Sequence, residues 1–320
     1  MVVSHIKELM MTVAQYKNKR SVLLENEVLR AEFLPDPGGK MVSLVNKKTG
    51  YEFLVQRPWP VYREQPFAGV YVNGECSGFD DMFPTIDTCA CENDPWQGTE
   101  LADHGEVWSL PWDVLSEDEN SIKMCVHGVR FPYLLEKRIS LTENAALRFD
   151  YLLTNLSPFD FDYLWAGHFM INLVEGTKVH VPDDCREMVA ILSGAGLKFG
   201  EVHQWPYLKD ANGETYRADV VRPKTVKGFE KYYFTNPLKQ GWCRLEYPNQ
   251  RDRLRLSFST ESVPYLGILM NEEGWDGLYN IIIEPCSVCY DRPDVAKQFG
   301  QRSVIRGKSN IHWNMVISME

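Results

Sequence analysis

Two ionisable side chains interrupt stretches of the sequence that are otherwise apolar. His168 lies within residues 163–173, YLWAGHFMINL, and Glu284 directly follows three isoleucines and precedes Pro285. Burying an ionisable group in such surroundings costs free energy unless the group is paired or takes part in chemistry. An imidazole and a carboxylate are also suited to transferring protons in enzymes. We therefore predict that His168 and Glu284 are functional residues; a hydrogen-bonded core histidine is the structural alternative for His168.

A second imidazole, His104, stands in residues 101–108, LADHGEVW. Gly105 would let a ligand approach the backbone closely, and Trp108, in a strand predicted for residues 107–115, offers an apolar face for stacking. The chain is also rich in aromatic residues, with 9 Trp, 15 Tyr and 15 Phe. Most of these belong in the core, but stacked aromatic rings also suit the faces of sugar rings. His104 and Trp108 are therefore candidates for contact with a ligand.

Other classes of function find no support in the sequence. It lacks a phosphate-binding loop, a dinucleotide-binding glycine motif, a Gly-x-Ser-x-Gly nucleophile turn and a His-Glu-x-x-His metal helix. The net charge is -10 without a basic cluster, so nucleic acid is not an expected partner. No apolar run reaches the roughly 18 residues that span a bilayer, and the first apolar stretch is too short for a signal peptide. We therefore expect a cytoplasmic protein with no membrane partner.

The eight cysteines are expected to be reduced and buried. The chain is long enough to form a core without disulfides, and several cysteines lie in apolar, strand-like segments such as residues 123–126. Two close pairs, Cys89 with Cys91 and Cys286 with Cys289, could supply thiolates to zinc, but the first spacing is shorter than in common zinc knuckles. We predict no metal site, although the sequence leaves metal binding by the cysteines open.

The elements that must position these residues are almost all strands. Helical spacing is found only at Ile6, Leu9, Met10 and Val13, which predicts a short helix in an N-terminal extension, residues 1–20. From residue 21 onward, short β-branched and aromatic runs alternate with turn residues. The clearest pattern is a long hairpin in which residues 135–141 and 147–153 flank a short polar connection. More than a dozen strands predict an all-β fold, a large antiparallel β-sandwich that forms one domain over residues 21–320.

The order of several short motifs resembles the galactose mutarotase-like (aldose 1-epimerase) superfamily. The motifs are His104-Gly105 before a tryptophan, His168 followed by an aromatic residue and then Asn172-Leu173, Glu284-Pro285 after an apolar strand, and residues 306–309, RGKS, before the last strand. Together they cover nearly the whole chain. The resemblance implies a super-sandwich of antiparallel strands with an open cleft, no cofactor or metal, and a free sugar as the small-molecule partner; a homodimer is left open.

The resemblance also implies roles for individual residues. Glu284 matches the general base of the family, His168 its general acid, and His104 a second histidine that contacts the sugar. Residues 228–231, GFEK, are similar to a segment that carries a substrate-binding aspartate, with Glu230 in its place. The early sugar-binding loop corresponds to residues 78–84, GFDDMFP, which lacks the family's Asn-Arg pair and carries Asp81 instead.

The chemistry of anomer exchange fits these residue types. The anomeric hydroxyl loses a proton while the ring oxygen gains one, the ring opens, and it closes on its other face, so one base and one acid suffice. We therefore expect an isomerase of the aldose 1-epimerase type.

Three alternatives stay open. A non-catalytic carbohydrate-binding or sensing protein would keep the aromatic residues and His104. A hexose-phosphate epimerase would need cations around a dianion, with Arg57, Arg63 and Arg130 as scattered candidates. A glycosidase would use two carboxylates, Asp81 and Glu284.

Overall fold

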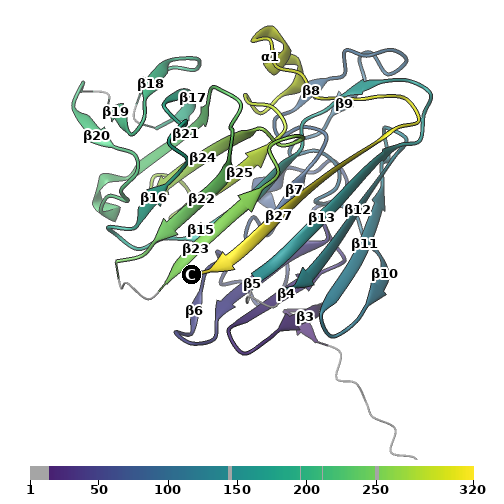
Figure 1. The fold of residues 1–320 in the computed structure, drawn as a ribbon, viewed down its shortest axis with the longest axis horizontal. Helices are drawn as coiled ribbons and strands as arrows, with labels where there is room; N and C mark the ends of the chain where they lie inside the picture. The colour runs from purple at the N-terminus through teal and green to yellow at the C-terminus, as the bar shows by residue number, and fades with distance from the viewer. Residues whose placement is uncertain (1–13, 143–145, 195, 211, 249–251) are drawn as a thin grey trace, which may run out of the picture.

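The protein is built from two large antiparallel sheets (Figure 1). The computed structural model describes residues 14–142, 146–194, 196–210, 212–248 and 252–320. The predicted helix around Ile6 to Val13 lies outside these residues. Within them the only α-helix is α1 (Pro293–Gln298), so no helix is long and apolar enough to cross a membrane. The predicted all-β architecture is confirmed.

The larger sheet has eleven strands and carries the candidate site. Ten of its strands follow one another across the sheet, and β6 pairs with the end of β5, at Val45 and Asn46. In spatial order they are β18 (Val202–Gln204), β17 (Glu187–Ser193), β21 (Gly228–Phe234), β24 (Tyr265–Glu272), β25 (Tyr279–Cys286), β15 (Ala166–Asn172), β7 (Phe79–Met82), β5 (Lys40–Asn46), β4 (Leu29–Leu34) and β3 (Val22–Glu25), with β6 (Tyr51–Glu52) beside β5.

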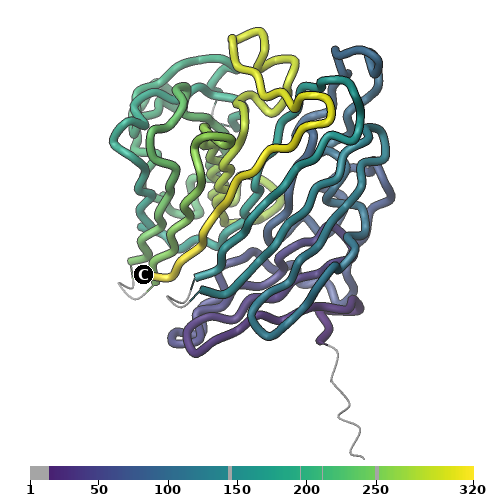
Figure 2. Tube along the Cα trace, turned by 45° about the vertical axis from the view of Figure 1, so that its right-hand side comes forward, coloured from purple at the N-terminus to yellow at the C-terminus, as the bar shows by residue number. Residues whose placement is uncertain are grey.

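The smaller sheet has eight strands and packs against one face of the larger one. Its strands in spatial order are β10 (Asp113–Glu117), β11 (Ser121–His127), β12 (Tyr133–Leu141), β13 (Ala146–Asn155), β27 (Asn310–Met319), β23 (Arg253–Phe258), β22 (Gly241–Glu246) and β16 (Lys178–His180). Figure 2 shows the C-terminal strand β27, in yellow, running between the teal strands of the β12–β13 hairpin and the green strands β22 and β23. The last strand of the chain thus joins the two halves of this sheet.

The β12–β13 hairpin is the long hairpin predicted from the sequence, with Leu141 paired to Leu147 next to the turn. Its residues alternate between buried and partly exposed, as expected for strands with one face on the core. Phe149 of β13 packs edge-on against Phe33 of β4 and Phe79 of β7, at ring-centroid distances of 6.4 and 5.6 Å. The main apolar core therefore lies between the two sheets.

Short elements complete the chain. They are the hairpins β1 (Gln15–Tyr16) with β2 (Lys19–Arg20), β8 (Cys89–Ala90) with β9 (Glu100–Leu101) and β19 (Tyr207–Lys209) with β20 (Thr215–Arg217), the pair β14 (Phe161–Asp162) with β26 (Val304–Ile305), and two single-turn helices, η1 (Tyr71–Asn73) and η2 (Lys224–Val226).

The strand predicted from residue 107 is wrong in its first half, because β10 begins only at Asp113. The segment before β10 is irregular, and the indole N–H groups of two tryptophans donate hydrogen bonds to backbone carbonyls within it. Trp108 Nε1 donates to the carbonyl of Asp103, and Trp112 Nε1 donates to the carbonyl of Val107, at 3.1 and 3.0 Å. These local bonds take the place of a strand ladder.

The other face of the larger sheet is covered as well. A second apolar cluster there includes Tyr71, Ile86, Met170, Tyr233 and Ile282. Some of these residues come from sheet strands, whereas Ile86 comes from a connecting segment and Tyr71 from η1. The larger sheet is therefore buried on both faces, and the candidate site lies between its outer face and these connections.

Candidate active site

Adjacent strands of the larger sheet place a row of polar and small residues on one face. The register sets Tyr233 of β21 opposite Gly267 of β24, and Gly267 opposite Glu284 of β25. His168 of β15 continues this row beside Glu284. Opposed residues in antiparallel strands point to the same side of a sheet, so Tyr233, Glu284 and His168 converge.

The predicted acid and base are in contact in this row. His168 Nε2 lies 3.7 Å from Glu284 Oε1. The Glu284 side chain is fully buried and is also held by Lys231 and Tyr233. Lys231 Nζ lies 3.1 Å from Oε1 and 2.9 Å from Oε2, and the Tyr233 hydroxyl donates to Oε2 at 3.1 Å.

Asp291 joins the same cluster from the segment that follows β25. Its Oδ1 lies 2.7 Å from Lys231 Nζ and also accepts a hydrogen bond from the Tyr233 hydroxyl. Lys231 and Tyr233 thus link two buried carboxylates, those of Glu284 and Asp291. A single ammonium shared in this way neutralises only part of their charge.

Burial and neighbouring charges change the proton affinities of these groups. Burial, together with the nearby His104 and Lys231, lowers the pKa of His168 well below 6.5. Burial raises the pKa of Glu284, an effect that the Lys231 ammonium opposes and the Asp291 carboxylate reinforces. Burial alone would lower the pKa of Lys231, but Asp291 and Glu284 outweigh it and raise that pKa, which keeps the ammonium charged. At neutral pH His168 is therefore an uncharged imidazole beside a charged lysine.

His104 reaches the site from a tight turn. Its backbone has a φ of 58°, and its ring stacks on Tyr71 with centroids 4.3 Å apart. Its Nδ1 lies 2.9 Å from the carboxylate of Asp103, which fixes the orientation of the ring. The ring of His168 lies edge-on to that of His104, with centroids 5.6 Å apart. The turn therefore brings the second predicted histidine to the first.

Behind the histidines, Tyr71 connects the site to another buried ion pair. Its hydroxyl donates to Asp80 Oδ2 at 2.8 Å and lies 3.5 Å from His168 Nδ1. Asp80 in turn is paired with Lys40 at 2.7 Å. His168 is thus supported on one ring nitrogen by Tyr71, while its other nitrogen faces Glu284.

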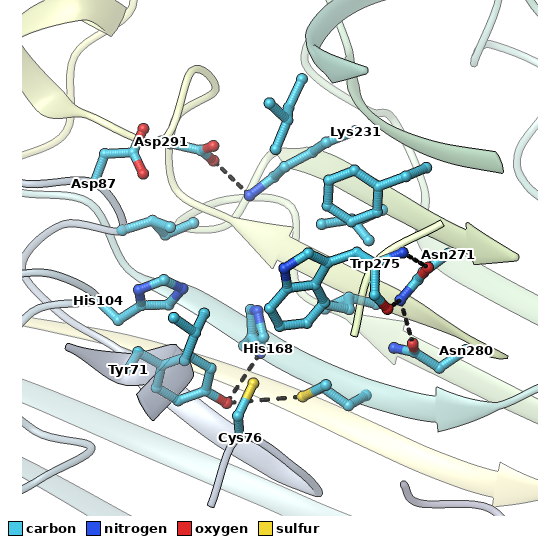
Figure 3. Close-up of a pocket in the computed structure, with 17 residues that line it drawn as sticks. Tyr71, Cys76, Asp87, His104, His168, Lys231, Asn271, Trp275, Asn280 and Asp291 are labelled. Carbon is cyan, nitrogen blue, oxygen red and sulfur yellow. Dashed lines mark hydrogen bonds and ion pairs between the residues drawn. The ribbon is translucent and has the colours of Figure 1, made fainter. Parts of the chain in front are cut away.

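A pocket of about 320 Å³ opens over this row (Figure 3). This volume lies at the lower end of the range for small-molecule sites, roughly 300–1,000 Å³, which suits a ligand about the size of one sugar. Glu284 lies beneath the surface of the pocket, covered by residues that line it. The lining residues are Tyr71, Val72, Cys76, Ile86, Asp87, His104, His168, Met170, Leu192, Phe229, Lys231, Leu269, Asn271, Trp275, Asn280, Ile282 and Asp291.

Besides Glu284, three of the predicted site residues do not line this pocket. Asp81 faces the space between the sheets, where it is fully buried, pairs with Lys137 at 2.6 Å and accepts a hydrogen bond from Trp165. Glu230 also points away from the pocket and pairs with Arg222 at 3.2 Å. Trp108 packs edge-on behind Tyr71, one layer from the pocket surface.

Several lining residues were missed by sequence reasoning, above all Lys231 and Asp291. Lys231 is the direct neighbour of Glu230, and strand alternation puts the two on opposite faces of the sheet. Asp291 lies in an irregular segment with a φ of 62°, so no strand pattern marks it. Its backbone conformation is visible only in the structure, so the sequence carried no signal for it.

The described residues contain no group of three or more His, Cys, Asp or Glu side chains arranged to hold a metal ion. All eight cysteines lie in this part of the chain, and all are free and buried, as expected. Burial raises the pKa of Cys76 and of Cys89 to about 11.

Comparison with solved structures identifies the fold. The Slr1438 protein from Synechocystis sp. PCC 6803 superposes with a TM-score of 0.70 at 17% identity, covering 96% of this chain and 99% of that one. A putative aldose 1-epimerase from Escherichia coli K12 gives a TM-score of 0.65 at 16% identity, with 94% and 98% covered. A galactose mutarotase-like protein from Lactobacillus casei ATCC 334 gives 0.64 at 18% identity, with 94% and 100% covered.

Comparison of sequences is less informative. Residues 8–106 match a family model described as a domain of unknown function, DUF5107. No curated protein matches the sequence significantly. The structural likeness extends over nearly the whole length of each chain, and on that basis this chain has the galactose mutarotase-like fold.

Proposed function

We propose that the protein binds a free aldose in this pocket and interconverts its α and β anomers by acid–base opening of the ring. The observation that carries the proposal is the contact between His168, which lines the pocket, and Glu284 beneath it, at 3.7 Å. One imidazole and one carboxylate are the minimum that the reaction needs. The similarity to a putative aldose 1-epimerase supports the same assignment.

In the proposed reaction Glu284 removes the proton of the anomeric hydroxyl, and His168 delivers a proton to the ring oxygen. The roles reverse when the ring closes on its other face. To reach Glu284, the hydroxyl replaces one of the two Lys231 contacts, while Asp291 retains the ammonium. Each proton-transferring group typically contributes about 10²–10⁴-fold to the rate.

A second candidate is a protein that binds a sugar without chemistry. The observation that favours it is the burial of Glu284, which Lys231 covers with contacts to both carboxylate oxygens. In this case the pocket would hold the sugar through His104, His168 and the aromatic residues, and Glu284 would serve only to hold Lys231.

The pocket is a poor match for a hexose phosphate. Asp87 and Asp291 face the ligand space, and Lys231 is already shared between two carboxylates. None of the three candidate arginines lines the pocket. Arg57 pairs with Asp276, Arg63 lies over the ring of Trp59, and Arg130 bonds to the carbonyl of Glu100. A dianion would meet net negative charge.

Polarimetry of freshly dissolved α-anomers, combined with calorimetric binding of the same sugars, tests the proposal. The wild-type protein should accelerate the change in rotation for at least one aldose. Glu284→Gln should slow this by about 10²-fold or more while sugar still binds, because Gln keeps the shape but cannot accept the proton. Glu119→Gln, an exposed site, is the matched control. Binding without acceleration by the wild type would reject the enzyme and leave the binding protein.

A further inference from the structure

One buried donor in the pocket lacks a partner. Asn280 of β25 lines the pocket and is only 1% exposed. Its Oδ1 accepts a hydrogen bond from Asn271 at 3.2 Å, but its Nδ2 has no hydrogen-bond partner among the described residues. A buried amide donor left unpaired costs free energy, so such a group calls for an explanation. Because this one lies at the wall of a pocket, a ligand oxygen is the natural partner.

The turn beside Asn280 is held in place. Trp275, on the turn between β24 and β25, lies between Asn280 and the histidines in Figure 3. Both its backbone groups are fixed by Asn271, whose Oδ1 accepts from the Trp275 N–H at 3.1 Å and whose Nδ2 donates to the Trp275 carbonyl at 3.0 Å. The same turn is anchored by the ion pair of Arg57 with Asp276, at 2.7 Å.

The wall beside this turn is continuous across the sheet. The register pairs Leu269 with Ile282 and Ile282 with Met170, so the three side chains form one apolar row on the pocket face. Phe229, opposite Asn271, closes the end of the pocket against Trp275, with ring centroids 6.1 Å apart. This end of the pocket therefore offers an apolar surface and the Asn280 donor, which has no partner among the described residues, whereas the charged groups gather at the other end.

We infer that this Trp275–Asn280 end is a subsite for the part of a sugar remote from its anomeric carbon, and that it selects a 6-deoxyhexose. The methyl group lies on the apolar row, and one ring hydroxyl accepts a hydrogen bond from Asn280 Nδ2. A 6-hydroxyl at the apolar row would lose its bonds to water without replacement. The orientation of the sugar rests on the proposed function, since the reacting carbon must face His168; the preference for a deoxysugar rests on the subsite alone.

Matched sugar pairs that differ only in the 6-hydroxyl provide the test: D-fucose with D-galactose, L-fucose with L-galactose, and L-rhamnose with L-mannose. Calorimetric titration should show that the 6-deoxy member of at least one pair binds about 10- to 100-fold more tightly, the range for rejecting an added hydroxyl in an apolar pocket. Equal affinity within all three pairs, tighter binding of the hydroxylated members, or no binding of any of the six sugars would overturn the inference.

Two variants separate the donor from the apolar row. Asn280→Leu should weaken binding of the preferred sugar about three- to tenfold, the effect of losing one hydrogen bond. Leu269→Thr, which places a hydroxyl on the apolar row, should reduce the preference for the 6-deoxy member without removing binding. Asn310→Leu, an exposed site outside the pocket, is the control. Unchanged affinity in Asn280→Leu, with an unaltered circular dichroism spectrum, would contradict the role of the donor.

These outcomes are distinguishable from failure of the proposed function. A wild-type protein that prefers 6-deoxy sugars but does not accelerate their anomerisation would reject the enzyme and support the subsite. Acceleration with no preference between the paired sugars would support the enzyme and reject the subsite.

Discussion

His168 and Glu284 come from strands far apart in the sequence, yet their Nε2 and Oε1 atoms lie 3.7 Å apart on neighbouring strands, β15 and β25. The burial that accompanies this contact lowers the pKa of the imidazole and raises the pKa of the carboxyl group. These shifts bring the two pKa values toward each other, and the proposed reaction needs one proton shared between the pair.

This sharing predicts the pH dependence of turnover. The value of kcat/KM should follow a bell whose maximum lies on the acidic side of pH 7. Toward alkaline pH the pair loses its last proton, and toward acidic pH it gains a second one. The lowered pKa of His168 and the raised pKa of Glu284 move the acidic and alkaline limbs of the bell. The pair still needs one proton for the reaction. A rate that stays constant from pH 5 to 9 would contradict the shared proton.

His168 should also contribute to the pH dependence of stability. Its pKa is lower in the folded protein than in the unfolded chain, where it is near 6.5, so the unfolded chain binds more protons below that pH. Stability from this group is fully present above pH 6.5 and is lost as the pH falls toward the folded pKa, at a slope of up to about 1.4 kcal/mol per pH unit. His168→Asn should remove this slope, which urea unfolding at pH 5, 6 and 7 would measure. Parallel curves for the two proteins would argue against a buried, neutral imidazole.

Strand patterns in the sequence predict much of the architecture. The β12–β13 hairpin was identifiable because one face of each strand packs on the core and the other is more exposed, which produces a clear alternation. His168 and Glu284 were identifiable for a related reason, since each interrupts a run of apolar residues. In both cases the prediction depended on a polar residue standing out against apolar neighbours in the sequence.

The same argument explains where prediction from the sequence failed. The larger sheet is buried on both faces, so its strands lose the alternation that tells one face from the other. In β21 the pocket-facing charge is Lys231 and not Glu230, and in β7 Asp80 lies on the pocket side whereas Asp81 pairs with Lys137 between the sheets. Adjacent residues of a strand point to opposite faces, so picking the wrong neighbour places the site on the wrong face. Only the contacts with the segments that cover the sheet show which residue faces the pocket.

Lys231 should be more important for stability than any surface lysine. Lys231→Met leaves Glu284 and Asp291 buried without their shared cation, and breaking a buried ion pair in this way costs about 3–5 kcal/mol. Urea unfolding of the variant and the wild type at pH 7 gives the difference. Lys297→Met is a suitable control, because its pair with Glu92 is exposed and should contribute about 0–1 kcal/mol. A Lys231 variant as stable as this control would show that the two carboxylates do not depend on the ammonium.

Gly267 should prove essential for the geometry of the acid–base row. A Cβ atom at this position would lie 2.4 Å from Cε1 of the Tyr233 ring and 3.0 Å from Oε2 of Glu284. Tyr233 is fully buried and cannot move aside freely, so Gly267→Ala should destabilise the fold by about 1–3 kcal/mol and displace the Glu284 carboxylate. Turnover should then fall further than sugar affinity, because His104 and the Trp275–Asn280 end of the pocket are left in place. Gly194→Ala is the matched control, since its Cβ would meet Phe229 only at an ordinary 3.6 Å. If both alanine variants unfold at the same urea concentration and turn over sugar equally well, then the positions of Tyr233 and Glu284 do not depend on the absence of a side chain at Gly267.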